Sequence, residues 1–219
     1  MTITQAKTNP TIISLSNNYL LCLRQFAART DIRTYLNGFH FRTAGGRAYI
    51  SATDGHMAAV IRTPEGSVTG PDINWCVPIN LFEKVLKGFS TITFGETIQA
   101  ANPESDAICE VTLTQDGAKL TVPTLAPGSR FPDVKRVIPI TPSGNQAVQI
   151  NLNLLSRIHK AFIAFHGKCK TFPVLGYPQE QGQTVLIDFG DPEFVGVVMP
   201  LRENPVVERP SWVGELSMA

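Results

Sequence analysis

The chain has 219 residues, of which 43% are hydrophobic and 17% are charged. This length and composition are typical of one large or two small folded domains with a hydrophobic core, and they exclude an intrinsically disordered chain. The formal net charge is only +1, which excludes a protein that is basic as a whole. Any surface for nucleic acid must therefore be a local basic patch.

The cysteines and the apolar runs indicate the compartment. Cys22, Cys76, Cys109 and Cys169 are scattered without CxxC or CxxH spacing. This pattern argues against a structural zinc site and a disulfide framework, and it favours a reducing cytoplasm. No apolar run approaches the roughly 18 residues of a membrane span, and the polar first ten residues are unlike a signal peptide. We therefore expect a soluble cytoplasmic protein.

The chain repeats one pattern three times: a short strand, an amphipathic helix and a run of strands. In the first unit the strand covers residues 11–16, and the helix covers residues 17–30 with Asn17 or Asn18 as its N-cap. The apolar residues at helical spacing are Leu20, Leu23, Phe26 and Ala27. Alternating segments then predict strands over residues 34–43, 47–53 and 56–63.

The second unit begins with a predicted strand over residues 74–79. Residues 80–89 are predicted to form a helix capped by Asn80, because apolar residues recur along it at helical spacing. These residues are Leu81, Phe82, Val85, Leu86 and Phe89. Strands are predicted over residues 91–95, 97–101, 108–114 and 119–125, with Gln-Asp-Gly as a turn signal before the last strand.

The third unit begins with a predicted strand over residues 147–152 and a helix over 153–168, in which Leu155, Ile158, Phe162 and Phe165 form the apolar stripe. Strands follow over residues 184–190 and 194–201. Residues 130–144 are predicted to be an extended, proline-punctuated linker. Units of about 60–70 residues suit an α+β fold in which the units merge antiparallel sheets and pack helices on one face.

The triplet Asp54-Gly55-His56 lies between two predicted strands. Asp-Gly is a strong signal for a hairpin turn, because Gly adopts left-handed backbone angles freely and Asp tolerates them. A reactive Asp54–His56 pair would also need a nucleophile and an orienting group, and none is nearby. No HExxH, GxSxG or phosphate-binding loop is present, so we expect a non-enzyme without metal or cofactor.

Basic residues flank the apolar stripes of all three predicted helices. A solvated helix face explains any one of these helices, but three helices of the same sign in a nearly neutral chain favour a shared basic surface that contacts phosphates without reading bases. The candidate DNA-facing residues are Arg24, Arg29, Lys84, Lys87, Arg157, Lys160, Lys168 and Lys170.

Three segments together resemble the bacterial DNA polymerase III β sliding clamp. They are "YLNGFHF…ISATDGHMAAV", "SRFPDVKRVIP" and "VGVVMPLR", in this order along the chain. The resemblance covers roughly residues 11–202. It implies a clamp domain over 11–139 with half-units 11–70 and 73–139, a linker over 140–146, a half-domain over 147–202 and a tail over 203–219. The family's first domain and half of its last have no counterpart.

The resemblance implies a non-enzymatic ring that surrounds duplex DNA without sequence preference. Its partners would be DNA polymerase, the clamp loader and other proteins that dock a glutamine–leucine-type peptide in an apolar pocket. The residues that match the family's pocket are Leu36, Thr53, Gly55, His56, Met57, Ala58, Pro132, Arg136, Val137, Val197, Val198, Met199, Pro200, Leu201 and Arg202. At Met57 and Ala58 the family usually has an arginine and often a leucine, so peptide preference is expected to differ.

Counting half-domains suggests how a ring could close. The family's ring contains twelve half-domains and this chain contains three, so four chains would supply the same number. Each third unit would complete a domain with its equivalent in another chain across a two-fold axis. Three functions stay open: a small sliding clamp from a phage or plasmid, a clamp mimic that binds host clamp-binding peptides without encircling DNA, and a transcription or repair adaptor.

Overall fold

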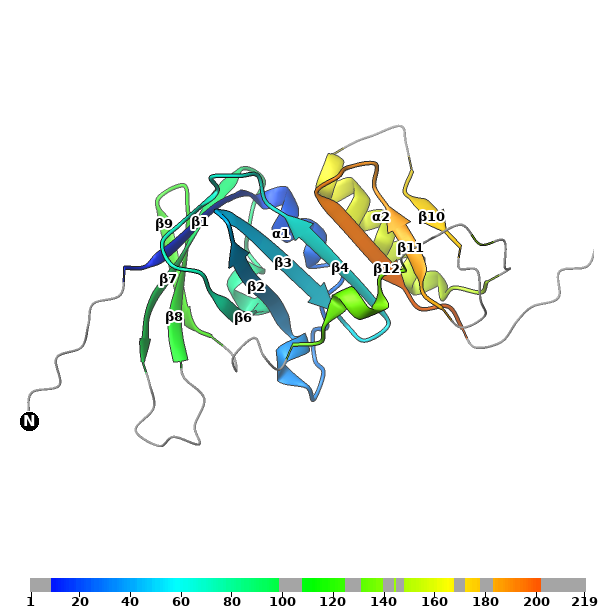
Figure 1. Ribbon diagram of the computed structural model, residues 1–219, viewed down its shortest axis with the longest axis horizontal. Helices are drawn as coiled ribbons and strands as arrows, with labels where there is room; N and C mark the ends of the chain where they lie inside the picture. Colours follow the sequence, from blue (N-terminus) through cyan, green and yellow to red (C-terminus); the bar gives the residue numbers. More distant parts are fainter. Residues whose placement is uncertain are drawn as a thin grey trace, which may run out of the picture.

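The framework of the chain is antiparallel β-structure (Figure 1). The structure is a computed structural model that describes residues 9–98, 108–124, 131–139, 144, 148–167, 172–177 and 183–201. The strands in these residues are β1 (Thr11–Ser16), β2 (Gly38–Ala44), β3 (Arg47–Thr53), β4 (Met57–Arg62), β5 (Val68–Thr69), β6 (Asn74–Pro78), β7 (Phe89–Ile98), β8 (Ile108–Gln115), β9 (Ala118–Pro123), β10 (Val174–Gly176), β11 (Val185–Asp188) and β12 (Phe194–Val198). They form a five-stranded sheet in the order β5-β1-β7-β8-β9 and a seven-stranded sheet in the order β10-β11-β12-β4-β3-β2-β6.

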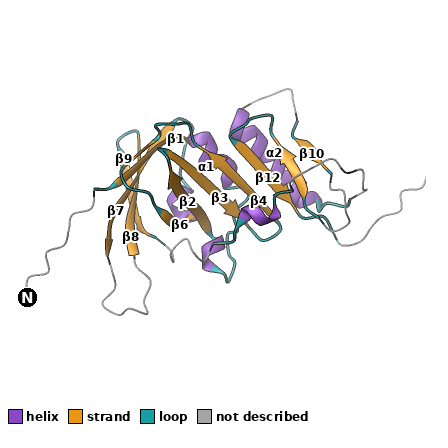
Figure 2. Cartoon of the chain, in the orientation of Figure 1, coloured by secondary structure: helices purple, strands orange, loops and turns teal. Residues whose placement is uncertain are grey.

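Two α-helices, α1 (Asn17–Leu23) and α2 (Leu152–His166), lie behind the seven-stranded sheet in the view of Figure 1 and pack against each other. Figure 2 shows the same elements coloured by secondary structure. The 3-10 helices in the described residues are η1 (Thr34–Leu36), η2 (Ile79–Phe82) and η4 (Val134–Val137). The predicted α+β class with merged antiparallel sheets and helices on one face is confirmed.

The first two units exchange their first strands. β1 of the first unit pairs with β7 of the second, and β6 of the second unit pairs with β2 of the first. In both pairings the residue just before the helix lies opposite the first residue of the receiving strand: Ser16 faces Phe89, and Pro78 faces Gly38. The two units are thus related by a repeated pairing rule.

The third unit extends the sheet of the first. β12 pairs with β4 in antiparallel fashion, from Val198 opposite Met57 to Phe194 opposite Ile61. Arg62 strengthens this junction, because its Nε donates to Glu193 Oε2 at 2.6 Å. Arg47 Nη1 also lies 3.9 Å from Glu193 Oε1, and both arginines lower the pKa of Glu193.

β4 shows how the seven-stranded sheet is covered on both faces. Met57, Ala59 and Ile61 point into the main core with the helices, whereas Ala58 packs in a second cluster on the outer face. This alternation follows from the two-residue period of a strand. In the outer cluster Ala58 meets Phe131 and Val134, together with Cys76 and Val197.

The predicted linker over residues 130–144 is therefore wrong for its described part. Residues 131–139 contain η4 and cover the outer face of the sheet, with Phe131 and Val134 buried. Asp133 begins this helix, because its side chain accepts a hydrogen bond from Lys135 N at 3.2 Å. Phe131 attaches this segment to the sheet, because it is buried in the outer cluster and stacks on His40 of β2.

The predicted helix over residues 80–89 is also wrong. η2 ends at Phe82, and Phe89 already belongs to β7 opposite Ser16. Asn17 holds the intervening chain away from a helical path, since its N donates to Gly88 O at 2.8 Å and its Nδ2 donates to Leu86 O at 2.7 Å. The apolar spacing was local, whereas strand pairing with β1 decides where the helix ends.

Smaller differences concern helix starts and short strands. Ser16, not Asn17 or Asn18, caps α1, because its side chain accepts from Asn18 N. Residues 148–151 are not a strand, although residues 147–152 were predicted as one, and Asn151 caps α2. β5 and β10 were not predicted, while the apolar stripe of α2 is confirmed. The tail over 203–219 lies outside the described residues.

Candidate functional site

The turn between β3 and β4 is built by Asp54. Its Oδ1 accepts hydrogen bonds from His56 N at 2.8 Å and Met57 N at 2.9 Å, and Gly55 has the left-handed φ of 88°. Thr53 Oγ1 donates to Met57 O at 2.8 Å. The predicted hairpin turn is confirmed, and in this geometry the Asp54 side chain serves the backbone rather than the His56 ring.

The second carboxylate oxygen of Asp54 binds α2. Arg157 Nη1 donates to Asp54 Oδ2, while Arg157 Nε and Nη2 donate to Gln25 O at 2.7 Å and Ala27 O at 3.1 Å. One guanidinium therefore joins the end of the first helical segment, the β3–β4 turn and α2. A charge that is used in this way within the chain is not free for a phosphate.

A cavity of about 150 Å³ lies beside this turn, at the junction of β4, β12 and η4. Ten of the predicted pocket residues line it, from three segments that are far apart in the sequence. They are Leu36, Thr53, Gly55, His56, Met57, Ala58, Pro132, Val137, Val197 and Met199. The structure also adds Arg33, Asp133, Val134 and Thr184. This space is the turn cavity.

Five predicted pocket residues are placed elsewhere. Val198 points into the main core, because it alternates with Val197 along β12. Arg136 has an 85% exposed side chain and does not line the turn cavity, although its Nε lies 3.7 Å from Oδ2 of Asp133, which does. Pro200 and Leu201 do not line it either, and Arg202 lies outside the described residues.

The residues that sequence reasoning missed come from two kinds of position. Arg33 precedes η1 and would have been indicated by its closeness to Leu36 in the sequence. Thr184 precedes β11, and its Oγ1 donates to Val137 O at 2.5 Å. No sequence signal links Thr184 with Val137, because these two residues meet only after β11 has been placed beside β12.

The turn cavity has an apolar floor and a polar rim. Leu36, Met57 and Val197 are buried, whereas Met199 is 47% exposed at the mouth. Arg33 at the rim pairs with Asp31 at 3.0 Å, and this pairing lowers the pKa of Asp31 to about 2. An apolar floor with a few polar groups at its rim suits the apolar side chains of a ligand, and the polar groups can orient the ligand.

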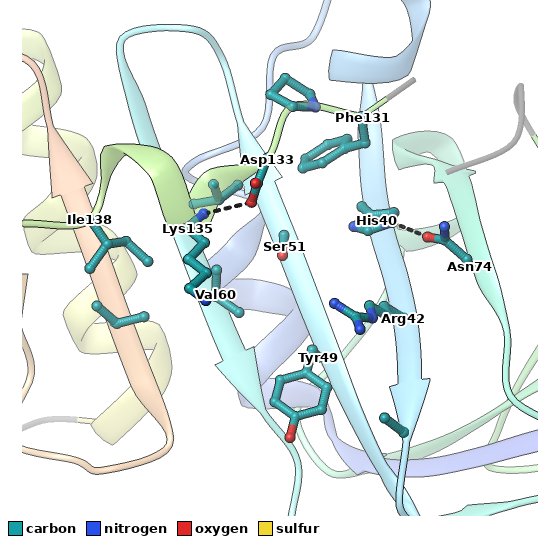
Figure 3. Close-up of a pocket in the computed structure, with 14 residues that line it drawn as sticks. His40, Arg42, Tyr49, Ser51, Val60, Asn74, Phe131, Asp133, Lys135 and Ile138 are labelled. Carbon is teal, nitrogen blue, oxygen red and sulfur yellow. Dashed lines mark hydrogen bonds between the residues drawn. The ribbon is translucent and has the colours of Figure 1, made fainter. Parts of the chain in front are cut away.

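A larger cavity of about 740 Å³ lies on the outer face of the seven-stranded sheet (Figure 3). His40 stacks on Phe131 with ring centroids 4.8 Å apart, and its Nε2 donates to Asn74 Oδ1 at 2.5 Å. Burial lowers the pKa of His40. Arg42 and Tyr49 lie opposite each other on β2 and β3 and line the same space.

The sequence held a signal for this outer cavity. His40 and Arg42 alternate along β2 on the same face, as Tyr49 and Ser51 do along β3. Polar residues on one face of a strand indicate a solvated face. The segment that turns this face into a cavity is residues 131–138, and its placement was not predicted.

The predicted DNA-facing residues do not share one helical surface. Arg24 Nη1 donates to Glu83 O at 2.9 Å, and Arg157 is bound as described above. Lys84 and Lys87 are exposed but lie beyond η2 rather than on an α-helix. Arg29 and Lys160 are exposed, and Lys168 and Lys170 lie outside the described residues.

In the part of the chain that the structure describes, no three His, Cys, Asp or Glu side chains gather in a way that could hold a metal ion. No helix in that part is long and apolar enough to span a membrane.

Comparisons with known proteins identify the fold. No family model matches the sequence, and no curated protein matches it. The DNA polymerase sliding clamp of Pseudomonas aeruginosa is similar in structure, with a TM-score of 0.59 and 16% identity over 93% of this chain and 69% of that one. The β subunit of DNA polymerase III of Thermotoga maritima has a TM-score of 0.60 and 13% identity, over 93% of this chain and 68% of that one. The β subunit of Borrelia burgdorferi has a TM-score of 0.61 and 12% identity, over 92% of this chain and 66% of that one. The chain therefore has the fold of the DNA polymerase III β sliding clamps.

Proposed function

We propose that this chain is a sliding-clamp-like processivity factor, a cytoplasmic non-enzyme that binds partner proteins through the turn cavity. The observation that carries the proposal is the meeting of three distant segments, which resemble the clamp family's peptide pocket, around one apolar space. Valine, methionine and leucine side chains form an adaptable surface for the apolar residues of a glutamine–leucine-type peptide. Its partners would be a DNA polymerase and a clamp loader that carry such peptides.

A labelled clamp-motif peptide tests the binding site. We expect fluorescence anisotropy to show saturable binding, and Met199→Ala to weaken it about tenfold, since an exposed anchor at the mouth is removed. Leu86→Ala is the matched control, because Leu86 is also an exposed apolar residue, 69% exposed, and it does not line the turn cavity. No binding by the unaltered chain, or equal affinity for Met199→Ala, would contradict the proposal.

We further propose that the chain encircles duplex DNA as a homo-oligomeric ring of four copies. The outer edge of β9, which pairs with no strand among the described residues, supports this arrangement. β9 occupies in the second unit the place that β4 and β12 occupy in theirs, and those two strands pair with each other. A β9–β9 contact between chains would repeat that pairing across a two-fold axis.

Retention on DNA tests the ring. We expect the protein, when assembled on a circular plasmid, to be retained during gel filtration and to be lost after the plasmid is cut once. Retention that survives linearisation would show ordinary binding instead of a topological link. A chain that binds the peptide and is never retained on the circle would support the second candidate.

The second candidate is a clamp mimic or adaptor that binds clamp motifs and modulates replication, repair or transcription without encircling DNA. The internal use of Arg157 and Arg24 favours it, because both guanidinium groups bind backbone carbonyls of the same chain. The absence of an α-helix over the described residues 80–89 favours it too, since one basic helix face fewer is available for phosphates.

A further inference from the structure

Among the described residues, the third unit has a strand with one unpaired edge and a short segment without a strand partner. β10 pairs with β11 on one edge, and no strand among the described residues pairs with its other edge. Residues 148–151 precede α2, and their backbone N–H groups donate to no acceptor in the described part of the chain. Unpaired backbone groups of this kind are a template for another strand.

The first two units show what occupies these positions when a unit is paired. The first strand of each crosses to the first strand of the other unit's meander, β1 to β7 and β6 to β2. In the third unit residues 148–151 correspond to β1 and β6, because each directly precedes its helix. β10 corresponds to β2 and β7, because each begins its meander. The third unit therefore has both a strand to give and an edge to receive one.

Residues 148–151 are already held as β1 is held on its other side. Ser14 N donates to Ser67 O at 2.9 Å, which fixes β1 beside the chain that follows β4. In the third unit Leu201 N donates to Gln149 O at 2.7 Å, and Leu201 follows β12. On the side that β7 occupies in the first unit, the segment has no partner in the described part of the chain.

The side chains repeat the same pattern. Val148 and Ile150 correspond to Ile13 and Leu15 of β1, because the first of each pair lies four residues before its helix and the second lies two residues before it. Ile13 and Leu15 are buried, but Val148 and Ile150 are only partly buried. At the start of α2 Leu152 is 79% exposed, and at and just before the start of β10 Val174 is 64% and Phe172 75% exposed. These large apolar residues would be covered by a strand on β10.

We infer that the third unit pairs with the third unit of a second copy of this chain, each giving residues 148–151 to β10 of the other. The reciprocal pairing of the first two units fixes the antiparallel register: Asn151 lies opposite Val174 of the partner, Ile150 opposite Leu175, and Gln149 opposite Gly176. The contact is isologous, because donor and acceptor lie on the same unit.

This inference gives the proposed ring one of its contacts between chains, and it rests on the proposed function only in that respect. The pairing of two chains is itself tested without DNA and without peptide. The first test is a disulfide. In a Gln149→Cys/Gly176→Cys chain the two thiols of facing residues lie within bonding reach across the interface. We expect covalent dimers on mild oxidation, resolved by non-reducing electrophoresis.

The matched control moves one thiol by two residues on the same strand face. In Gln149→Cys/Val174→Cys the thiols are diagonal neighbours, about 7–8 Å apart at their backbones, which is too far for a disulfide. We expect few covalent dimers. Equal or greater cross-linking of this control, or none in the facing pair, would overturn the register.

The second test is the mass in solution. We expect light scattering to give a mass of two chains or a multiple of two, and Val174→Lys to lower it by at least half, since a lysine charge blocks an edge. Ile32→Lys, at a 97% exposed residue outside the strands, is the control and should keep the mass. An unaltered chain that stays monomeric, or a Val174→Lys chain of unchanged mass, would overturn the inference. Peptide binding by Val174→Lys separates this outcome from failure of the turn cavity.

Discussion

Arg157 on α2 and Asp54 in the β3–β4 turn form an ion pair that joins the third unit of the chain to the rim of the turn cavity. Asp54 also holds the turn by accepting two backbone hydrogen bonds, so one carboxylate fixes both the shape of the turn and its position against α2. Its side chain is only 10% exposed, which makes solvent screening of this pair weaker than for a surface pair.

The pair should therefore couple in a double-mutant cycle. We expect Asp54→Ala and Arg157→Ala each to lower the free energy of unfolding, with a coupling energy of about 1–3 kcal/mol, measured by urea denaturation. Asp133→Ala with Arg136→Ala is the control cycle, because that pair is exposed and its coupling should stay below about 1 kcal/mol. Equal coupling in both cycles would contradict a structural role for Arg157.

Met57 gives a prediction that separates stability from partner choice. It lines the turn cavity but is only 2% exposed and packs in the main core, so an arginine there would bury a charge. We expect Met57→Arg to lower the free energy of unfolding by about 3 kcal/mol or more, whereas Met57→Leu should cost less than about 1.5 kcal/mol. A stable Met57→Arg chain would show that this side chain can reach the rim.

His40 predicts a dependence of stability on pH. Burial lowers its pKa in the folded chain, so the unfolded chain binds a proton more readily. The folded state is thus favoured at neutral pH, and this contribution is lost as the pH falls through the ordinary histidine range near 6.5. We expect the unfolding free energy of His40→Phe to change less between about pH 7.5 and about pH 5.5 than that of the unaltered chain. An identical pH dependence would contradict this assignment.

The described cysteines should be unreactive in the folded chain. Cys22, Cys76 and Cys109 are free and buried, and burial raises the pKa of each thiol, that of Cys76 to about 12. Since the thiolate is the reactive form, we expect a Cys169→Ser chain to react with a thiol reagent at least about tenfold more slowly when folded than in urea. Rapid titration of three thiols without denaturant would contradict the buried placement.

The sequence was most informative where a pattern and its cause are both local. Alternation predicted β1 and β3 at their observed bounds, and helical spacing predicted the stripe of α2 with Ile158, Phe162 and Phe165 buried. Asp54-Gly55 predicted the turn for the same reason, since backbone angles and side-chain acceptors within three residues decide it. The segments that line the turn cavity were predicted from the resemblance to the sliding-clamp family, which rests on three short motifs.

Contacts between distant residues decided the rest. Residues 80–89 carry a helical pattern, but Phe89 pairs with Ser16, and a strand partner 73 positions away in the sequence overrides local spacing. Phe131 turns an apparent linker into the wall of a cavity, because it stacks on His40 on the outer face of the sheet. Thr184 and Arg33 reach the turn cavity only through the pairing of β12 with β4 and the position of η1.

The sequence by itself determined which segments become strands or helices in most of the chain and where the β3–β4 turn lies, because periodicity and turn chemistry act over a few residues. Only the tertiary structure decided which strands pair, that the helix predicted over residues 80–89 ends at Phe82, and which side chains meet at the turn cavity. The physical reason is that hydrogen bonds of a sheet and contacts of a core are satisfied between residues that the chain order does not bring together.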